Sequence, residues 1–123
     1  MMSPNKWEIW LAKVKFEDNP TQVKPRPVLV IDSKRCYIIS IKITSHPPRT
    51  EYDGEYSIVK WSEAGLNKAS TIRCSKRLKL FNSDFVHKLG RLHPIDIISI
   101  QKNWGDKTPL VLRIVKILFI VNI

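Results

Sequence analysis

The sequence has 123 residues, enough for one domain with a modest hydrophobic core but not for two. An apolar content of 43% excludes a disordered polar chain. Lys and Arg number 21 against 11 Asp and Glu, a net charge of +10. This excess favours a polyanionic partner, nucleic acid ahead of a membrane surface, with a merely solubilising charge as the alternative.

Localisation and redox state are predicted from the first residues and the cysteines. Residues 1–6 lack the apolar core of a signal peptide, so we expect a cytoplasmic protein without membrane insertion. Cys36 and Cys74 each lie in a strand-like run, and we expect reduced thiols. Two cysteines without a suitable histidine pattern do not form a zinc site, so no metal or cofactor is expected.

The first predicted element is a half-buried strand in the second half of Trp7–Phe16. Lys13 and Lys15 alternate there with apolar residues, which is typical of a strand with one solvated face. Trp7 and Trp10 either pack in the core, which is the favoured interpretation, or stack on a nucleic-acid base beside a basic groove.

The stretch Lys24–His46 predicts a β-hairpin. Two apolar runs are joined by the polar turn 32–35. Arg26 lies between two prolines just before the first strand, and Thr44, Ser45 and His46 follow the second. Because the start of one antiparallel strand lies beside the end of the next, the hairpin brings a guanidinium near a pair of hydroxyls. We take this as the candidate site.

A polar loop, Glu17–Val23, leads into this hairpin and should overhang its Arg26 end. Glu17 is a candidate for acid–base chemistry, although a solvated turn carboxylate is the simpler interpretation.

The second half of the chain predicts short elements on a basic background. Residues 60–91 carry eight Lys or Arg against Glu63 and Asp84, which favours one directed basic face over scattered charge. The expected elements are a strand at 56–59, a helical turn at 61–66, alternating strands at 70–74 and 77–81, and helices at 85–89 and 95–104.

We expect a single domain, 1–123, with a barrel core at about 7–104 and an apolar C-terminal tail at 105–123. Leu110–Ile123 is strongly apolar but is too short, and too interrupted by Arg113 and Lys116, for a comfortable membrane span. An added strand, a helix packed on a partner subunit and a poorly ordered tail all remain open. Short strands with brief helices predict a mainly β fold, a small, mostly antiparallel barrel or half-barrel.

The candidate chemistry concerns phosphate. The sequence contains no phosphate-binding glycine loop, no His-Glu-x-x-His and no nucleophile elbow. A guanidinium can hold phosphate and stabilise added negative charge, and a small polar group can position an attacking oxygen. In RNA the 2′-hydroxyl itself can attack phosphorus, so Arg26, Thr44, Ser45, His46 and Arg73 would suffice for metal-independent cleavage.

Several blocks, in order, resemble PemK/MazF-type toxins of type II toxin–antitoxin systems. The opening of that family is matched by Trp7–Ala12, Phe16–Asp18 and Lys24–Val30. Lys42–Arg49 matches a block of the PemK-like branch, and the series continues with Trp61–Leu66, Ser70–Arg73 and Lys88–Leu92. The resemblance spans Trp7–Trp104, and the tail after Gly105 has no counterpart in it.

The resemblance implies an SH3-like small barrel, the fold shared with CcdB-like plasmid maintenance toxins, and usually a homodimer. It implies an endoribonuclease, or mRNA interferase, that cleaves single-stranded RNA without metal and so inhibits translation. It also implies a cognate antitoxin, whose flexible segment occupies the RNA groove. By resemblance, Arg26 and Thr44 are the catalytic residues.

Further site residues are predicted around this pair. Arg73 matches a basic residue that some members use, but Ser75 stands where some members carry an aspartate proposed as the base. The proton acceptor therefore stays open between Thr44, His46 and Glu17. The predicted RNA-binding residues are Lys15, Lys24, Ser45, Arg73, Ser75 and Lys76.

Two alternatives are kept. The same fold includes non-catalytic poisons of DNA gyrase, so the fold alone does not establish an activity. A gyrase poison has no need of the Arg26 and Thr44 pair, which favours the nuclease. The other alternative is a degenerate, RNA-binding toxin inactivated by Ser75 or by the tail.

Overall fold

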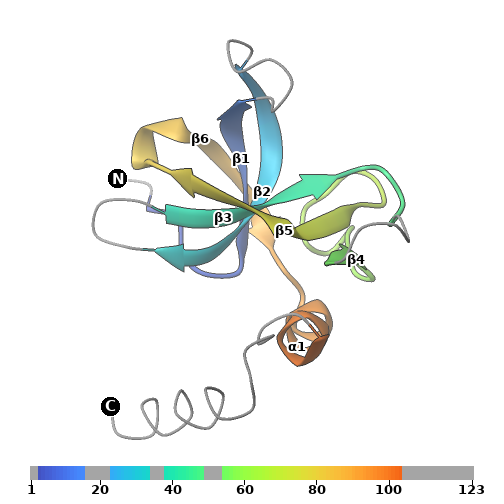
Figure 1. Cartoon of the computed structure of the whole chain (residues 1–123). Helices are drawn as coiled ribbons and strands as arrows, with labels where there is room; N and C mark the ends of the chain where they lie inside the picture. Colours follow the sequence, from blue (N-terminus) through green and yellow to red (C-terminus); the bar gives the residue numbers. More distant parts are fainter. Residues whose placement is uncertain (1–2, 16–22, 34–37, 49–53, 104–123) are drawn as a thin grey trace, which may run out of the picture.

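The computed structural model describes residues 3–15, 23–33, 38–48 and 54–103, and its main element is one antiparallel sheet (Figure 1). The six strands lie in the order β4-β5-β3-β2-β1-β6. A 3-10 turn precedes β6, and one short helix, α1, follows it. The bounds are β1 Glu8–Lys15, β2 Val23–Ser33, β3 Ile38–Thr44, β4 Glu55–Ser57, β5 Thr71–Leu80, η1 Asn82–Asp84, β6 Phe85–Arg91 and α1 Pro94–Asn103. The predicted mainly β antiparallel fold is confirmed.

The predicted hairpin is formed by β2 and β3. Val28 pairs with Lys42 and Leu29 with Ile41 across the two strands. Because successive side chains of a strand point to opposite faces, this register decides which residues enter the core and which line the surface.

The two faces of the sheet bury two different apolar clusters. One cluster joins Ile9, Leu29 and Ile41 of the central strands to α1, through Ile100, and to the segment between β4 and β5. The other lies on the opposite face and contains Trp10, Ala12, Val14, Val28, Val30 and Leu80. The Trp10 side chain is only 3% exposed, which favours the core interpretation of this indole over base stacking.

The predicted helix at 85–89 is wrong, because these residues belong to β6. Phe85 pairs with Ala12 of β1, and His87 pairs with Leu11. The capping signal before them closes only the 3-10 turn, in which the Asp84 carboxylate accepts the Phe81 N–H at 2.9 Å. The edge of β1 supplies backbone partners that a five-residue helix would have to supply for itself.

Other predicted elements are refined. The strand expected at 56–59 is β4, and the expected helical turn at 61–66 is a hydrogen-bonded turn without a helix. The runs 70–74 and 77–81 are parts of one strand, β5, which contains an irregularity: Ile41 pairs with Arg77, whereas Lys42 pairs with Arg73. The helix expected at 95–104 is α1, with Ile100 buried and Ile98 exposed.

Several predictions concern residues outside the described ranges. The C-terminal tail 105–123, Glu17 and Cys36 are among them. Cys74 is half-buried on β5. Within the described ranges, no helix is both long and apolar enough to cross a membrane.

Two glycines permit a close backbone crossing between β6 and the 61–66 turn. A Cβ at Gly90 would lie 2.1 Å from the Ala64 carbonyl oxygen, and one at Gly65 would lie 2.0 Å from the Leu89 carbonyl oxygen. Gly65 also has a φ of +93°, a left-handed conformation that favours glycine. Both neighbours are backbone atoms, so neither contact can relax by a rotamer change.

We predict that Gly90→Ala lowers the free energy of unfolding by about 1–3 kcal/mol, the usual cost of overpacking a tight contact. Urea denaturation measures it. Ser57→Ala, at an exposed position of β4, should stay within about 0.5 kcal/mol of wild type. Equal stability of the two variants would contradict the crossing.

A buried carboxylate, that of Glu8, joins the N-terminal segment to β6. Its oxygens accept the Asn5 backbone N–H at 2.7 Å and the Trp10 indole N–H at 3.0 Å, and the Lys88 ammonium lies 2.8 Å away. Burial by itself raises the Glu8 pKa, but the hydrogen bond from Lys88 and the other donors outweigh it. The pKa therefore lies below its ordinary value of 4.5.

Because the folded-state pKa of Glu8 is lowered, its contribution to stability is complete above pH 4.5 and is lost as the pH falls through the folded value. Glu8→Gln should lower the free energy of unfolding at pH 7 by about 1–2 kcal/mol. It should also reduce the loss of stability below pH 4.5, measured by urea titration at several pH values. Glu63→Gln, a change at an exposed carboxylate, serves as the control. An unchanged pH profile in Glu8→Gln would refute the assignment.

Candidate active site

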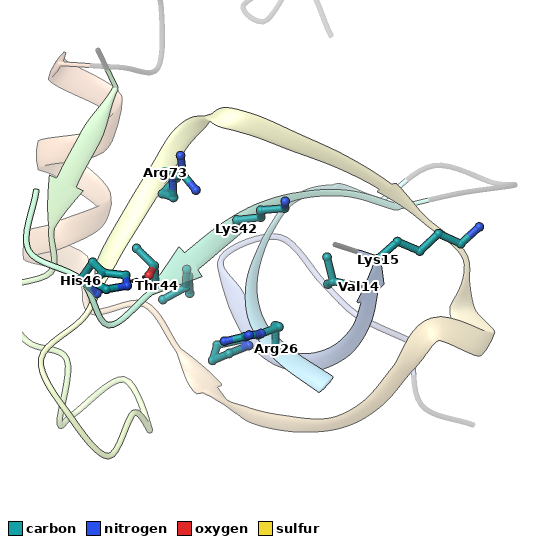
Figure 2. A pocket seen from close by; sticks show the side chains of 9 residues that line it. Val14, Lys15, Arg26, Lys42, Thr44, His46 and Arg73 are labelled. Carbon is teal, nitrogen blue, oxygen red and sulfur yellow. Dashed lines mark hydrogen bonds between the residues drawn. The ribbon is translucent and has the colours of Figure 1, made fainter. Parts of the chain in front are cut away.

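A surface pocket of about 380 Å³ opens at the Arg26 end of the hairpin (Figure 2). Four of its lining side chains are those of Lys or Arg. The full lining is Val14, Lys15, Arg26, Pro27, Lys42, Ile43, Thr44, His46 and Arg73. Figure 2 shows Arg26 reaching from β2 toward Thr44 and His46, whereas Lys15 extends away from them.

Strand register explains why these cations converge. Val28, Lys42 and Arg73 are cross-strand neighbours on β2, β3 and β5. Arg26 precedes Val28 by two residues and Thr44 follows Lys42 by two, so period two places both on the same face of the sheet. The pocket therefore continues the face that buries Val28.

Hydrogen bonds hold the segment that follows β3. The His46 backbone N–H donates to Thr44 Oγ1 at 3.3 Å. The Thr71 hydroxyl, which is buried, donates to the His46 carbonyl oxygen at 2.6 Å. Since Thr44 Oγ1 already accepts one bond, its own proton can be donated into the pocket.

Arg73 is held by an ion pair with Glu55. Its Nε lies 3.2 Å from Glu55 Oε2, and the two residues are direct cross-strand partners on β4 and β5. The Glu55 side chain is 3% exposed and that of Arg73 is 21% exposed. A carboxylate this deeply buried needs such a partner, because an unpaired charge is costly to bury.

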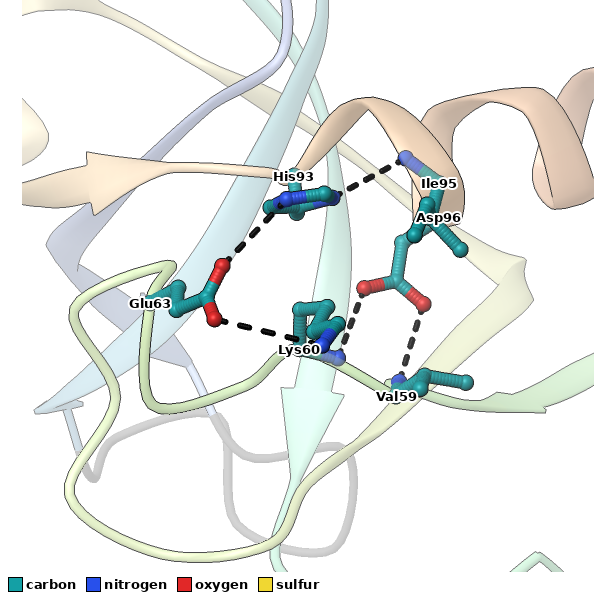
Figure 3. Close-up of polar contacts among 6 residues, drawn as sticks. All are labelled: Val59, Lys60, Glu63, His93, Ile95 and Asp96. Carbon is teal, nitrogen blue, oxygen red and sulfur yellow. Dashed lines mark hydrogen bonds and ion pairs between the residues drawn. The ribbon is translucent and has the colours of Figure 1, made fainter.

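Strand β4 is fixed in turn by α1. The Tyr56 hydroxyl donates to Asp96 Oδ1 at 2.6 Å. The backbone N–H groups of Val59 and Lys60 each donate to the same carboxylate at 2.9 Å (Figure 3). Asp96 is fully buried. Burial and the hydrogen bond to Asp96 raise the pKa of Tyr56, so the phenol stays protonated and donates.

His93 caps α1, away from the pocket. Its Nδ1 accepts the Ile95 N–H at 3.1 Å, and its Nε2 lies 3.3 Å from Glu63 Oε2 (Figure 3). The Nε2-protonated tautomer therefore satisfies both contacts without a charge on the ring. His93 and Glu63 belong to the support of the helix.

The structure brings together five of the predicted site residues: Arg26, Thr44, His46, Arg73 and Lys15. Lys24, Ser45 and Lys76 are described but do not line the pocket, Glu17 lies outside the described residues, and so does the side chain of Ser75. No observation tests the roles assigned to the predicted site residues, and these roles remain predictions.

Sequence reasoning missed Lys42 and Glu55. Lys42 could have been found, because it precedes Thr44 by two residues in the same strand. Glu55 carried no such signal, since its pairing with Arg73 depends on where β4 docks. Within the described ranges, no group of three or more His, Cys, Asp or Glu could hold a metal ion.

Comparison with protein families identifies the chain. Residues 5–103 match the model of the PemK-like, MazF-like toxin of type II toxin–antitoxin systems. The chain belongs to this family. The resemblance predicted from the ordered sequence blocks is thereby confirmed, whereas comparison with curated protein sequences gives no match.

Solved structures show that this PemK/MazF-family chain has a MazF-like fold. It superposes on the Mycobacterium tuberculosis toxin MazF-mt6 with a TM-score of 0.62 at 20% identity, covering 80% of this chain and 92% of that one. An endoribonuclease from a mycobacterial species gives 0.63 at 12% identity, covering 89% and 98%. A mycobacterial endoribonuclease in complex with its cognate antitoxin gives 0.62 at 10% identity, covering 87% and 100%.

We predict that Thr71→Val loosens the segment after β3. Losing the bond to the His46 carbonyl should lower the free energy of unfolding by about 1 kcal/mol. It should also speed amide exchange at His46, measured by NMR. Ser70→Ala removes the neighbouring hydroxyl-to-carbonyl bond, from Ser70 to Lys68, and should leave His46 exchange unchanged. Equal exchange in both variants would show that Thr71 does not hold this segment.

Proposed function

We propose that the chain is the toxin of a type II toxin–antitoxin system and a sequence-selective endoribonuclease that cleaves single-stranded mRNA without a metal ion, so inhibiting translation. The observation that carries the proposal is the pocket in which Arg26 and Thr44 lie together among further cations, in a chain of this toxin family. The endoribonuclease names of its structural neighbours agree with it.

The pocket suits a phosphodiester. Arg26, Lys42 and Arg73 approach it from three strands, so a bound phosphate meets positive charge on several sides. Guanidinium groups stabilise the extra negative charge of a pentacovalent phosphorus better than that of the ground state. The Thr44 hydroxyl donates a hydrogen bond to a non-bridging oxygen of the phosphate.

The reaction uses a nucleophile that RNA carries. The 2′-oxygen forms a bond to the adjacent phosphorus, the bond from phosphorus to the 5′-oxygen breaks, and a 2′,3′-cyclic phosphate and a 5′-hydroxyl result. The 2′-hydroxyl proton goes to a base, and the 5′-oxygen takes a proton from solvent. We assign the base to His46, because it lines the pocket and imidazole exchanges protons near neutral pH.

Partners follow from the same surface. Unpaired RNA is the substrate, because its bases and its 2′-hydroxyl are accessible. We further propose a homodimer and an acidic cognate antitoxin segment that occupies the cationic pocket in place of RNA; one structural neighbour was solved with its cognate antitoxin.

The test is cleavage of a mixed-sequence, single-stranded RNA in excess EDTA, with cut sites mapped by sequencing. Wild type should cut at a restricted set of sites and leave the all-deoxy oligonucleotide intact, because DNA lacks the attacking hydroxyl. Arg26→Ala should lower kcat/KM by about 10²–10³-fold, the cost of losing one charge stabiliser. Thermal unfolding checks that the variant is folded.

The matched control is Lys68→Ala, which removes an exposed cation outside the pocket lining. It should cleave within about twofold of wild type. Cleavage that stops on chelation, or that persists in Arg26→Ala, would refute the mechanism. Binding to DNA gyrase by a protein that cuts no RNA would favour the gyrase poison instead.

A further inference from the structure

Glu55 is a buried acid directly behind the candidate site. Its side chain is 3% exposed, less than that of any other carboxylate in the described ion pairs. It does not line the pocket, but its Oε2 lies 3.2 Å from Nε of Arg73, which does. Its contact with the pocket is therefore made through a guanidinium.

The geometry of this pair orients Arg73. A guanidinium carries one N–H on Nε and the others on its two Nη atoms, in one rigid plane. When Nε donates to Glu55, the Nε edge of the Arg73 guanidinium faces the carboxylate and the plane of the guanidinium is fixed. The Nη groups then point away from Glu55. An arginine without such a partner loses rotamer entropy each time it meets a phosphate.

The residues on either side of Glu55, Gly54 and Tyr56, are both held by hydrogen bonds. The Gly54 carbonyl accepts the Cys74 N–H at 2.6 Å, and Tyr56 is bonded to the buried Asp96 of α1. On β5, the irregular pairing between Arg73 and Arg77 lies directly beside the ion pair. Irregularities of this kind re-aim side chains next to functional sites.

We infer that Glu55 is a positioning residue: it acts through Arg73, fixing the guanidinium plane so that its Nη groups meet the scissile phosphate. The inference rests on the proposed nuclease function. Glu55 is not the base that takes the 2′-hydroxyl proton, because its carboxylate is buried behind Arg73 and already accepts a hydrogen bond from Arg73 Nε. Its charge also offsets one of the cations that crowd the pocket.

A positioning role has a distinct kinetic signature. Glu55→Ala leaves all pocket cations in place and removes a nearby negative charge, so RNA binding is retained and KM should not rise. Misorientation of Arg73 should lower kcat by about 10–100-fold, as small displacements of catalytic groups do. Glu55→Gln keeps an oxygen that can accept the Nε–H, and should recover most of this loss.

The deciding experiment is a double-mutant cycle with Arg73→Met, with kcat and KM measured on a short single-stranded RNA. Glu55→Ala should have no further effect on kcat in the Arg73→Met background, because the residue through which it acts is gone. The cycle is repeated with Glu55→Gln, which preserves shape, so that a folding defect of the alanine variant does not decide the result. Glu63→Gln, a change in an ion pair outside the pocket, should match wild type.

The outcomes separate the two proposals. If wild type cleaves RNA and Glu55→Ala lowers kcat equally with and without Arg73, or raises KM alone, the positioning role is overturned while the nuclease proposal stands. If wild type cleaves no RNA, the proposed function fails and the inference falls with it. Loss of kcat that depends on Arg73, at unchanged KM, supports both.

Discussion

The register of the β2–β3 hairpin is the constraint on which the site depends. Val28 must face the apolar cluster of Trp10 and Leu80, and it pairs with Lys42. Period-two alternation then places Arg26 and Thr44 on the same face, beyond the edge of that cluster. A slip of one residue would turn Val28 from this cluster to the opposite face of the sheet and would separate the two candidate catalytic residues. Burial of the core and assembly of the pocket are therefore one structural requirement.

The edge strand β4 and the helix α1 support Arg73 on this face. Strand β4 contributes only three residues, yet it carries Glu55 to Arg73 and is itself held by the bond from Tyr56 to Asp96. The helix thus acts on the pocket at a distance: its buried carboxylate fixes β4, β4 fixes the ion pair, and the ion pair limits the orientation of Arg73. The buried carboxylates of Glu55 and Asp96 are tolerated because each has partners at hydrogen-bonding distance.

Local patterns predicted the elements whose own residues decide their conformation. The two apolar runs around Val28 and Ile41, joined by a polar turn, indicated the hairpin. Pro94 and the apolar face of the residues after it indicated α1. Lys42 was within reach of the same reasoning, two residues before Thr44. The strand at Phe85–Leu89 could not be predicted in this way. A cap followed by five mixed residues is as compatible with a short helix as with a strand, and the strand is favoured only because the edge of β1 offers it backbone partners. The role of Glu55 could not be predicted either, because a strand of three residues has no periodic pattern.

The sequence by itself determined the family, the excess of positive charge, and the placement of Arg26 and Thr44 at one end of a hairpin. These depend on residue types and on contacts between segments close along the chain. The tertiary structure alone decided that Glu55 lies behind Arg73, that β6 completes the sheet, and that two glycines let β6 cross the 61–66 turn. The physical reason is that each of these pairings depends on docking between strands and turns far apart in sequence, which follows from how the sheet curls and not from any local propensity.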